Sequence, residues 1–202
     1  MNFIAFDTSH RFLRVCAEVD GKLSVHEDRS PLQHSTTLMP AIDRLLGENK
    51  KCIEAIGVCV GPGSFTGIRI GVTTAKTLAW AWNVPIVPFT SAELYGFREK
   101  KAWVAVDGGN RVYYAAAIAD GRVTGGITEI GESEMAAAAD AQPYDAVLIG
   151  YEREERICKE PDLGAAAIAE LVRQKLFRGE TCGFAEAEPL YIQLSQAEKD
   201  KA

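Results

Sequence analysis

The chain repeats part of itself at an offset of one hundred residues, and this repeat constrains the fold more than any other feature. Residues 4–22 and 104–122 share six identical positions: Ala5/Ala105, Asp7/Asp107, Arg11/Arg111, Ala17/Ala117, Asp20/Asp120 and Gly21/Gly121. Each copy has the pattern of a buried strand that ends in Asp, a tight turn, a second strand and an Asp-Gly hairpin into a third strand. The repeat predicts two related lobes.

The segments that follow the two copies agree with a duplication. The first copy precedes patterns for a helix over 35–47, a strand over 55–60, a helix over 66–82 and a strand over 86–89. The second precedes a helix over 132–140, a strand over 145–149 and a helix over 163–178, with Asp162 and Gly179 as its caps. We therefore expect an α/β protein of two βββαβα lobes, residues 1–98 and a shortened 99–202, linked near 97–101. The last helix and tail are expected to pack back on the first lobe.

Composition narrows the class of protein. Of the 202 residues, 47% are hydrophobic and 25% charged, which is typical of a soluble globular protein with a buried core. The net charge of −6 argues against a protein that binds nucleic acid without a partner, because phosphate binding needs a basic face. The five cysteines form no CxxC pair, and the sequence has neither a signal peptide nor a bilayer-spanning run. These features predict a cytoplasmic protein without a membrane partner.

A glycine-rich string, GPGSFTGIRIGV, lies between a predicted strand and a predicted helix. Glycines can bring the backbone close to a ligand, and the first N–H groups of a helix can bind an anion. A cation in the first helical turn opposes the helix dipole, so Arg69 is expected to face an anion or a carboxylate such as Asp7. The candidate anion loop comprises Gly61, Gly63, Ser64, Thr66, Gly67 and Arg69, with Asp7 and Asp107.

A plainer interpretation of the same residues stays open. The glycines could simply make a close-packed turn with Arg69 in solvent, and each Asp could open a turn through its own backbone hydrogen bonds. The string is not a Walker A loop, because no Gly-Lys-Ser/Thr ends it.

The sequence offers no catalytic or metal-binding set. Two histidines at i and i+4 can share a metal on one helix face, but His10, His26 and His34 have no such spacing. His34 is expected near a helix N-terminus. Ser64 lacks the context of a nucleophile elbow. We therefore expect no catalytic residue and no metal.

Two helices of the first lobe predict an interface. Gly67, Gly71, Ala75 and Ala79 recur every four residues, which would let another helix approach closely. The helix over 35–47 has more apolar residues than one face needs, and surplus apolar surface suggests a partner. The alternative is that both helices only cover their own sheet. The predicted interface residues are Leu38, Met39, Ile42, Leu45, Leu46, Ile68, Gly71, Val72, Ala75, Ala79 and Trp82.

The duplicated lobe, with an Asp at the end of each first strand, resembles the actin and sugar-kinase superfamily. Within it, the glycine string resembles the TsaB (YeaZ) family. Three further motifs agree: IAFDTS at 4–9, His34-Ser35 followed by Leu38 and Pro40, and AEPLY at 187–191. The second hairpin departs from the family pattern, since Arg111 stands where a carboxylate is usual, and the stretch after Tyr151 is short.

The resemblance implies a non-catalytic scaffold that binds and activates a TsaD-like enzyme, which transfers a threonylcarbamoyl group to the adenosine beside the anticodon of tRNA. It also implies a homodimer in isolation through the same two helices, with a TsaE-like ATPase and the enzyme that makes threonylcarbamoyl-adenylate as further partners. Contact with tRNA would occur only through the complex. No cofactor is required, although ATP or ADP could contact the partner interface. The alternative is a phosphotransferase or glycoprotease-like hydrolase of the same fold.

Overall fold

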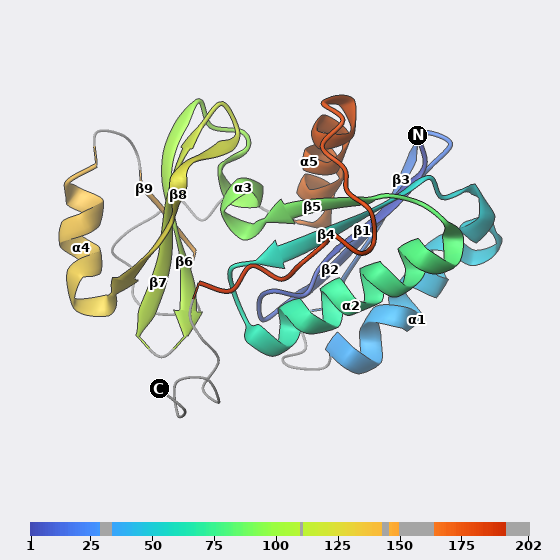
Figure 1. Cartoon of the computed structure of the whole chain (residues 1–202), viewed down its shortest axis with the longest axis horizontal. Coiled ribbons are helices and arrows are strands. Elements are labelled where there is room, and N and C mark those ends of the chain that lie inside the picture. The colour runs from blue at the N-terminus through green and yellow to red at the C-terminus, as the bar shows by residue number, and fades with distance from the viewer. Residues whose placement is uncertain (29–33, 110, 143–145, 150–163, 193–202) are drawn as a thin grey trace.

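The computed structural model describes residues 1–28, 34–109, 111–142, 146–149 and 164–192 (Figure 1). These residues form two sheets that lie side by side, with helices on their faces. The predicted α/β class and the two related lobes are both confirmed.

The first lobe is a five-stranded mixed sheet in the order β3-β2-β1-β4-β5. Strands β1, β2 and β3 pair antiparallel, whereas β4 and β5 continue the sheet in parallel from β1. The bounds are β1 Phe3–Asp7, β2 Leu13–Val19, β3 Lys22–Asp28, β4 Ala55–Gly61 and β5 Ile86–Thr90. Between them lie α1 His34–Leu46, the 3-10 helix Gly47–Cys52 and α2 Phe65–Trp82.

The second lobe repeats the same arrangement in a four-stranded sheet of order β8-β7-β6-β9. Again the first three strands pair antiparallel and the last joins the central strand in parallel. The bounds are β6 Lys101–Gly109, β7 Val112–Ala119, β8 Arg122–Gly131, α4 Glu132–Asp140 and β9 Ala146–Ile149.

Both faces of the first sheet are covered. On β1, Ile4 and Phe6 face a core under α1 and α2, whereas Phe3 and Ala5 face a second core that α5 (Ala165–Phe177) covers from the other side (Figure 1). Successive side chains of a strand point to opposite faces, so the four residues of β1 before Asp7 are all apolar. The second core extends into the other lobe, which gives the two sheets a shared interior.

The local signals that predicted the turns act as expected. Asp20-Gly21 and Asp120-Gly121 each have two positive φ angles, as a type I′ hairpin turn requires. The α5 helix ends at Phe177 and is followed by Gly179, which has φ +70°, and the N–H of Glu180 donates back to the carbonyl of Lys175. The expected N-cap Asp162 lies outside the described residues, and the N–H of Ala165 is instead bound by Glu27 at 2.6 Å.

The sequence patterns did not predict one helix. The α3 helix, Ser91–Gly96, lies between the two sheets and starts with a capping box of Thr90 and Glu93. The expected linker after it is anchored: Phe97 is buried in the shared core, and Lys101 already belongs to β6.

Candidate functional site

The glycine string forms a tight clasp around the turn that follows β1. The backbone N–H of Ser64 donates to the carbonyl of Ser9 at 2.7 Å, and the hydroxyl of Thr8 donates to the carbonyl of Gly67 at 2.7 Å. A Cβ on Gly67 would lie 2.0 Å from the backbone carbonyl oxygen of Thr8. A Cβ on Gly63 would lie 2.4 Å from the backbone carbonyl oxygen of Ser9. The glycines are therefore needed for close packing of two backbone segments, which favours the plainer interpretation.

The N–H groups of Ser64 and Gly67 both bind acceptors within the chain. Ser64 is the N-cap of α2, where its hydroxyl accepts from the N–H of Gly67 at 3.3 Å. Gly61 has φ +109° and packs against Ile68, while Thr66 is exposed. The hydroxyl of Ser64 therefore stabilises the N-terminus of α2.

Arg69 corrects one expectation. Its Nε donates to the hydroxyl of Tyr191 at 2.8 Å, and its guanidinium carbon lies 4.2 Å from the centre of the Phe65 ring. It does not pair with Asp7, whose oxygens are occupied by Ser9 and Arg14. Stacking on aromatic rings stabilises this exposed cation despite its place near the start of a helix.

Asp7 lies fully buried at the end of β1, at the centre of a polar cluster. Its Oδ1 accepts from the N–H of Ser9 at 2.8 Å and from the Ser9 hydroxyl at 2.6 Å, and its Oδ2 lies 3.4 Å from Arg14. Burial alone would raise the pKa of Asp7, but His10, Arg14 and the Ser9 hydrogen bonds outweigh it, and the pKa is lowered. The carboxylate thus holds the turn, as the plainer interpretation of Asp7 requires.

His10 lies in the turn after β1 and contacts residues of α1 and α3. It packs edge-on against Tyr95 with ring centres 5.7 Å apart, and its carbonyl accepts from Nε2 of His34 at 2.7 Å. The charges of both Asp7 and Asp107 act on it, so the two repeated carboxylates flank the same region. Within the described part of the chain, Nε2 of His10 is buried without a hydrogen-bond partner. Burial lowers the pKa of His10, which favours the neutral ring at neutral pH.

The cluster lacks the features of a reactive centre. The thiol of Cys59 is buried, donates to Ser9 at 3.3 Å and has a pKa well above its ordinary value, mainly because of burial. Among the residues that the structure describes, no group of His, Cys, Asp and Glu side chains could hold a metal ion.

Replacing His10 by Phe should make the free energy of unfolding less dependent on pH below neutrality. A buried neutral His whose folded pKa lies below the unfolded value of 6.5 contributes stability above that pH, and this contribution falls as pH drops. Between pH 7.5 and 5.5 we expect wild type to lose about 1 kcal/mol more than His10→Phe, since one proton accounts for at most about 1.4 kcal/mol per pH unit. Denaturant titrations at both values measure this. The control is His26→Gln on the edge strand β3, and an unchanged slope in His10→Phe would contradict the assignment.

The small-residue strip of α2 also corrects an expectation. Gly67, Gly71, Ala75 and Ala79 are all buried against the chain's own first lobe. A Cβ on Gly71 would lie 2.4 Å from the Thr8 hydroxyl oxygen, so the strip admits the turn and the sheet, and not a partner helix. The same core contains Leu38, Ile42, Leu46, Ile68 and Val72.

The outer face of α1 and α2 consists of other residues. Of the predicted interface set, Met39 is exposed and Leu45 and Trp82 are half-buried. The helix spacing left out the largest exposed side chain of this face, Trp80, at 67%. Its place one position after the buried Ala79 could have identified it, because adjacent helical residues differ by about 100°.

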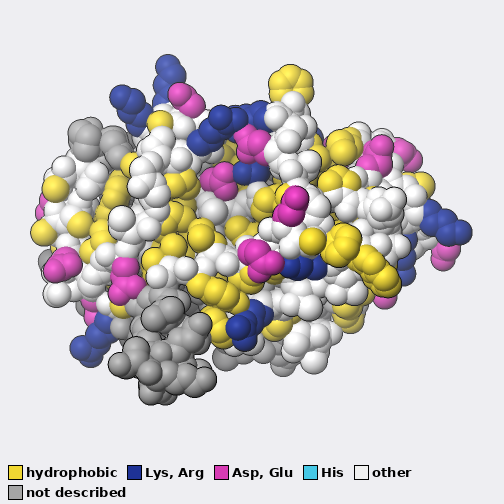
Figure 2. Space-filling view, in the orientation of Figure 1, with side chains coloured by type: hydrophobic (Ala, Val, Ile, Leu, Met, Phe, Trp, Pro, Cys, Tyr) yellow, Lys and Arg dark blue, Asp and Glu magenta, His cyan; other side chains and the backbone are white. Residues whose placement is uncertain are grey.

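A strap formed by residues 180–191 runs along one side of α2. Glu188 pairs with Lys76 at 2.8 Å, Tyr191 contacts Arg69, and the N–H of Leu190 donates to the carbonyl of Val60 at 2.8 Å. The tail therefore forms part of the surface beside α2. On the face drawn in Figure 2, positive, negative and hydrophobic side chains are mixed, and no basic area dominates.

No helix within the described ranges is long and apolar enough to cross a membrane.

Comparison with known proteins agrees with this architecture. A YeaZ structure from Pseudomonas aeruginosa superposes with a TM-score of 0.76 at 23% identity, over 95% of this chain and 99% of that one. A second crystal structure from the same organism, of an uncharacterized protein with similarity to the peptidase YeaZ, gives 0.79 at 23% identity and the same coverage. These likenesses confirm the predicted α/β fold of two duplicated lobes.

Sequence relatives are more specific. TsaB of Bacillus subtilis, a tRNA threonylcarbamoyladenosine biosynthesis protein, is 38% identical over 97 residues, which is 46% of this chain and 42% of the relative. TsaB of Escherichia coli is 32% identical over 90 residues, 43% of this chain and 39% of the relative. The chain thus matches less than half the length of these relatives. The profile of the TsaD family, tRNA N6-adenosine threonylcarbamoyltransferase, matches residues 28–142. The chain therefore belongs to the TsaD family, and less than half of its length is also similar to TsaB proteins.

Proposed function

We propose that this chain is a non-catalytic accessory subunit that binds a TsaD-like enzyme and activates threonylcarbamoyl transfer to the adenosine next to the anticodon of tRNA. One observation carries the proposal beyond the names of the relatives. The glycine string and the Asp7 carboxylate, which could have bound a ligand, contact the chain's own residues instead. Thr8 and Ser9 pack against the glycines, and Ser9 and Arg14 bind the oxygens of Asp7. Because these groups hold the chain's own turn, they favour a role in binding a partner protein over a role in catalysis.

The surface that we assign to the partner is the outer face of α1 and α2. It carries Met39 at 42% exposure and Trp80 at 67%, whereas the half-buried Leu45 and Trp82 pack against the lobe's own core. Large aromatic side chains that are exposed on a helix face are enriched at interface centres. In isolation, the same face would pair two copies of the chain, so that the enzyme and the second copy compete for it.

The remaining parts of the assembly follow from this role. A TsaE-like ATPase would join the complex, tRNA would be contacted only through the complex, and the site of action would be the cytoplasm. The mixed charge of the visible face fits this assignment, because direct tRNA binding depends on a basic surface (Figure 2).

Trp80→Glu should abolish binding of the TsaD-like enzyme from the same organism. A charge buried without a partner in an interface costs several kcal/mol, about a hundredfold or more in affinity. The matched control is Phe177→Glu, which changes an equally apolar side chain, 94% exposed, at the end of α5. Co-elution in size-exclusion chromatography and calorimetric titration measure the affinity. Retained binding in Trp80→Glu, with loss in Phe177→Glu, would place the interface on α5 instead.

A further inference from the structure

A cavity of about 640 Å³ lies between the two lobes, apart from the Asp7 cluster. Its walls come from both lobes and from the strap, and none of the residues of the Asp7 cluster lines it. The lining residues are Thr90, Glu93, Arg122, Val123, Gly126, Ile127, Glu180, Leu190 and Ile192. A cavity of this size suits a small organic molecule.

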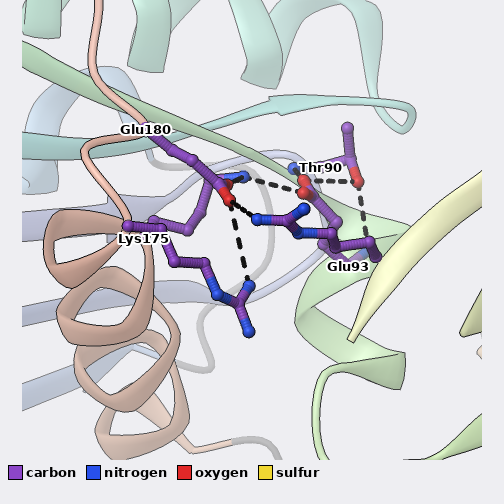
Figure 3. A network of polar contacts seen from close by, with 6 residues as sticks. Thr90, Glu93, Lys175 and Glu180 are labelled. Carbon is purple, nitrogen blue, oxygen red and sulfur yellow. Dashed lines mark hydrogen bonds and ion pairs between the residues drawn. The ribbon is translucent and has the colours of Figure 1, made fainter. Parts of the chain in front are cut away.

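The polar side of the cavity is a connected network of charges (Figure 3). The buried Lys175 donates to Glu93 at 2.7 Å and lies 3.0 Å from Glu180, and Arg122 of the second lobe lies 2.6 Å from the other oxygen of Glu180. Glu93 also accepts from the N–H of Thr90 at 2.7 Å. Both carboxylates are thus already occupied by donors, so they do not call for a cationic ligand.

The charges of the network do not balance. Three cations, Lys175, Arg122 and Arg178, face the two carboxylates Glu93 and Glu180. Arg178 is the most distant of them, at 3.9 Å from Glu180. Arg122 is 56% exposed and contacts Glu180 through one terminal nitrogen, while a guanidinium carries five N–H donors. The network therefore has room for one further negative charge beside Arg122.

The opposite wall is apolar and opens at a glycine bulge. Val123, Ile127, Leu190 and Ile192 supply the apolar surface. Between them, Gly125 and Gly126 have φ of +74° and +90° and stand outside the β7–β8 ladder, where the register shifts. A Cβ on either glycine would meet no atom within 4 Å, so close packing does not explain them. Bulges are frequent beside binding sites because they redirect a strand locally.

We propose that this cavity binds a small amphipathic anion, whose carboxylate or phosphate pairs with Arg122 and whose apolar body lies against Val123, Ile127 and Leu190. Arg suits such a head group because its planar donors match an anion in a bidentate manner. Such a ligand would touch both lobes and the strap together. The site is separate from the face assigned to the partner enzyme, so the inference does not depend on the proposed function.

Three probes of similar size test the proposal on the full chain: 4-phenylbutanoate, its neutral amide and phenyl phosphate. Calorimetry and NMR shift mapping should show binding of at least one anion, with shifts at Val123 and Ile127, and the amide about tenfold weaker or more. Binding by the carboxylate alone or the phosphate alone identifies the head group.

Arg122→Gln should weaken anion binding by about tenfold or more. The control is Arg98→Gln, which breaks a similar exposed pair, Arg98–Glu170 at 2.7 Å, without lining the cavity. Circular dichroism checks that both variants fold. Three results would each overturn the proposal: equal binding of amide and acid, unchanged binding in Arg122→Gln, or no binding of either anion at a ligand concentration of about 10 mM. This concentration is about the weak limit for a specific small ligand.

Discussion

Gly67→Ala should strongly destabilise this chain, although alanine is the better helix former. In an ordinary helix interior, Gly to Ala stabilises by about 1 kcal/mol. Here the added Cβ would lie 2.0 Å from the backbone oxygen of Thr8, which cannot rotate away as a side chain can. We expect a loss of about 3 kcal/mol or more in the free energy of unfolding, because the clasp between α2 and the β1–β2 turn must open.

Denaturant titration followed by circular dichroism measures the effect of Gly67→Ala. Gly131→Ala is the matched control: its φ is −69°, and its added Cβ would meet no atom closer than 4.0 Å. We expect this control to change stability by less than about 0.5 kcal/mol. Similar stability in the two variants would show that the glycine string does not clasp the turn.

Glu93→Ala should cause the second large loss. Glu93 accepts from Lys175 at 2.7 Å and also closes the capping box of α3 through Thr90. Removing it leaves the buried Lys175, whose side chain is 9% exposed, with Glu180 alone. We expect about 3 kcal/mol of destabilisation, since a broken buried pair leaves a charge in the protein interior.

A double-mutant cycle separates the charge from the cap. Lys175→Met removes the buried cation at similar volume, so Glu93→Ala combined with Lys175→Met should lose less than the sum of the single losses. Arg98→Ala supplies the comparison, because the exposed Arg98–Glu170 pair should contribute less than about 1 kcal/mol. Additive losses in the cycle would mean that Lys175 and Glu93 do not depend on one another.

Local sequence signals predicted the scaffold well. The two Asp-Gly turns and the repeated strand order depend on neighbouring residues, so the sequence carries them directly. The α3 helix was missed because it has only six residues, although its capping box, Thr90 to Glu93, is a readable start signal.

The site was harder to predict for a physical reason. The four-residue spacing of Gly67, Gly71, Ala75 and Ala79 defines one face of α2, but spacing does not state whether that face turns to a partner or to the chain's own sheet. The partner of Arg69 is Tyr191, 122 residues away, and no local pattern links the two. Contacts between residues far apart in the sequence determine both the burial of the small-residue face of α2 and the partner of Arg69.

We propose that this chain activates a TsaD-like enzyme and does not itself catalyse the transfer. The most direct test of this proposal is the rate of tRNA threonylcarbamoylation by the purified enzyme of the same organism, with supplied threonylcarbamoyl-adenylate, in the presence and absence of this chain. We expect no product from the chain alone, an increase in the enzyme's rate of about tenfold or more when the chain is added, and no increase with Trp80→Glu. Product formed by the chain alone, or an enzyme whose rate the chain leaves unchanged, would contradict the claim.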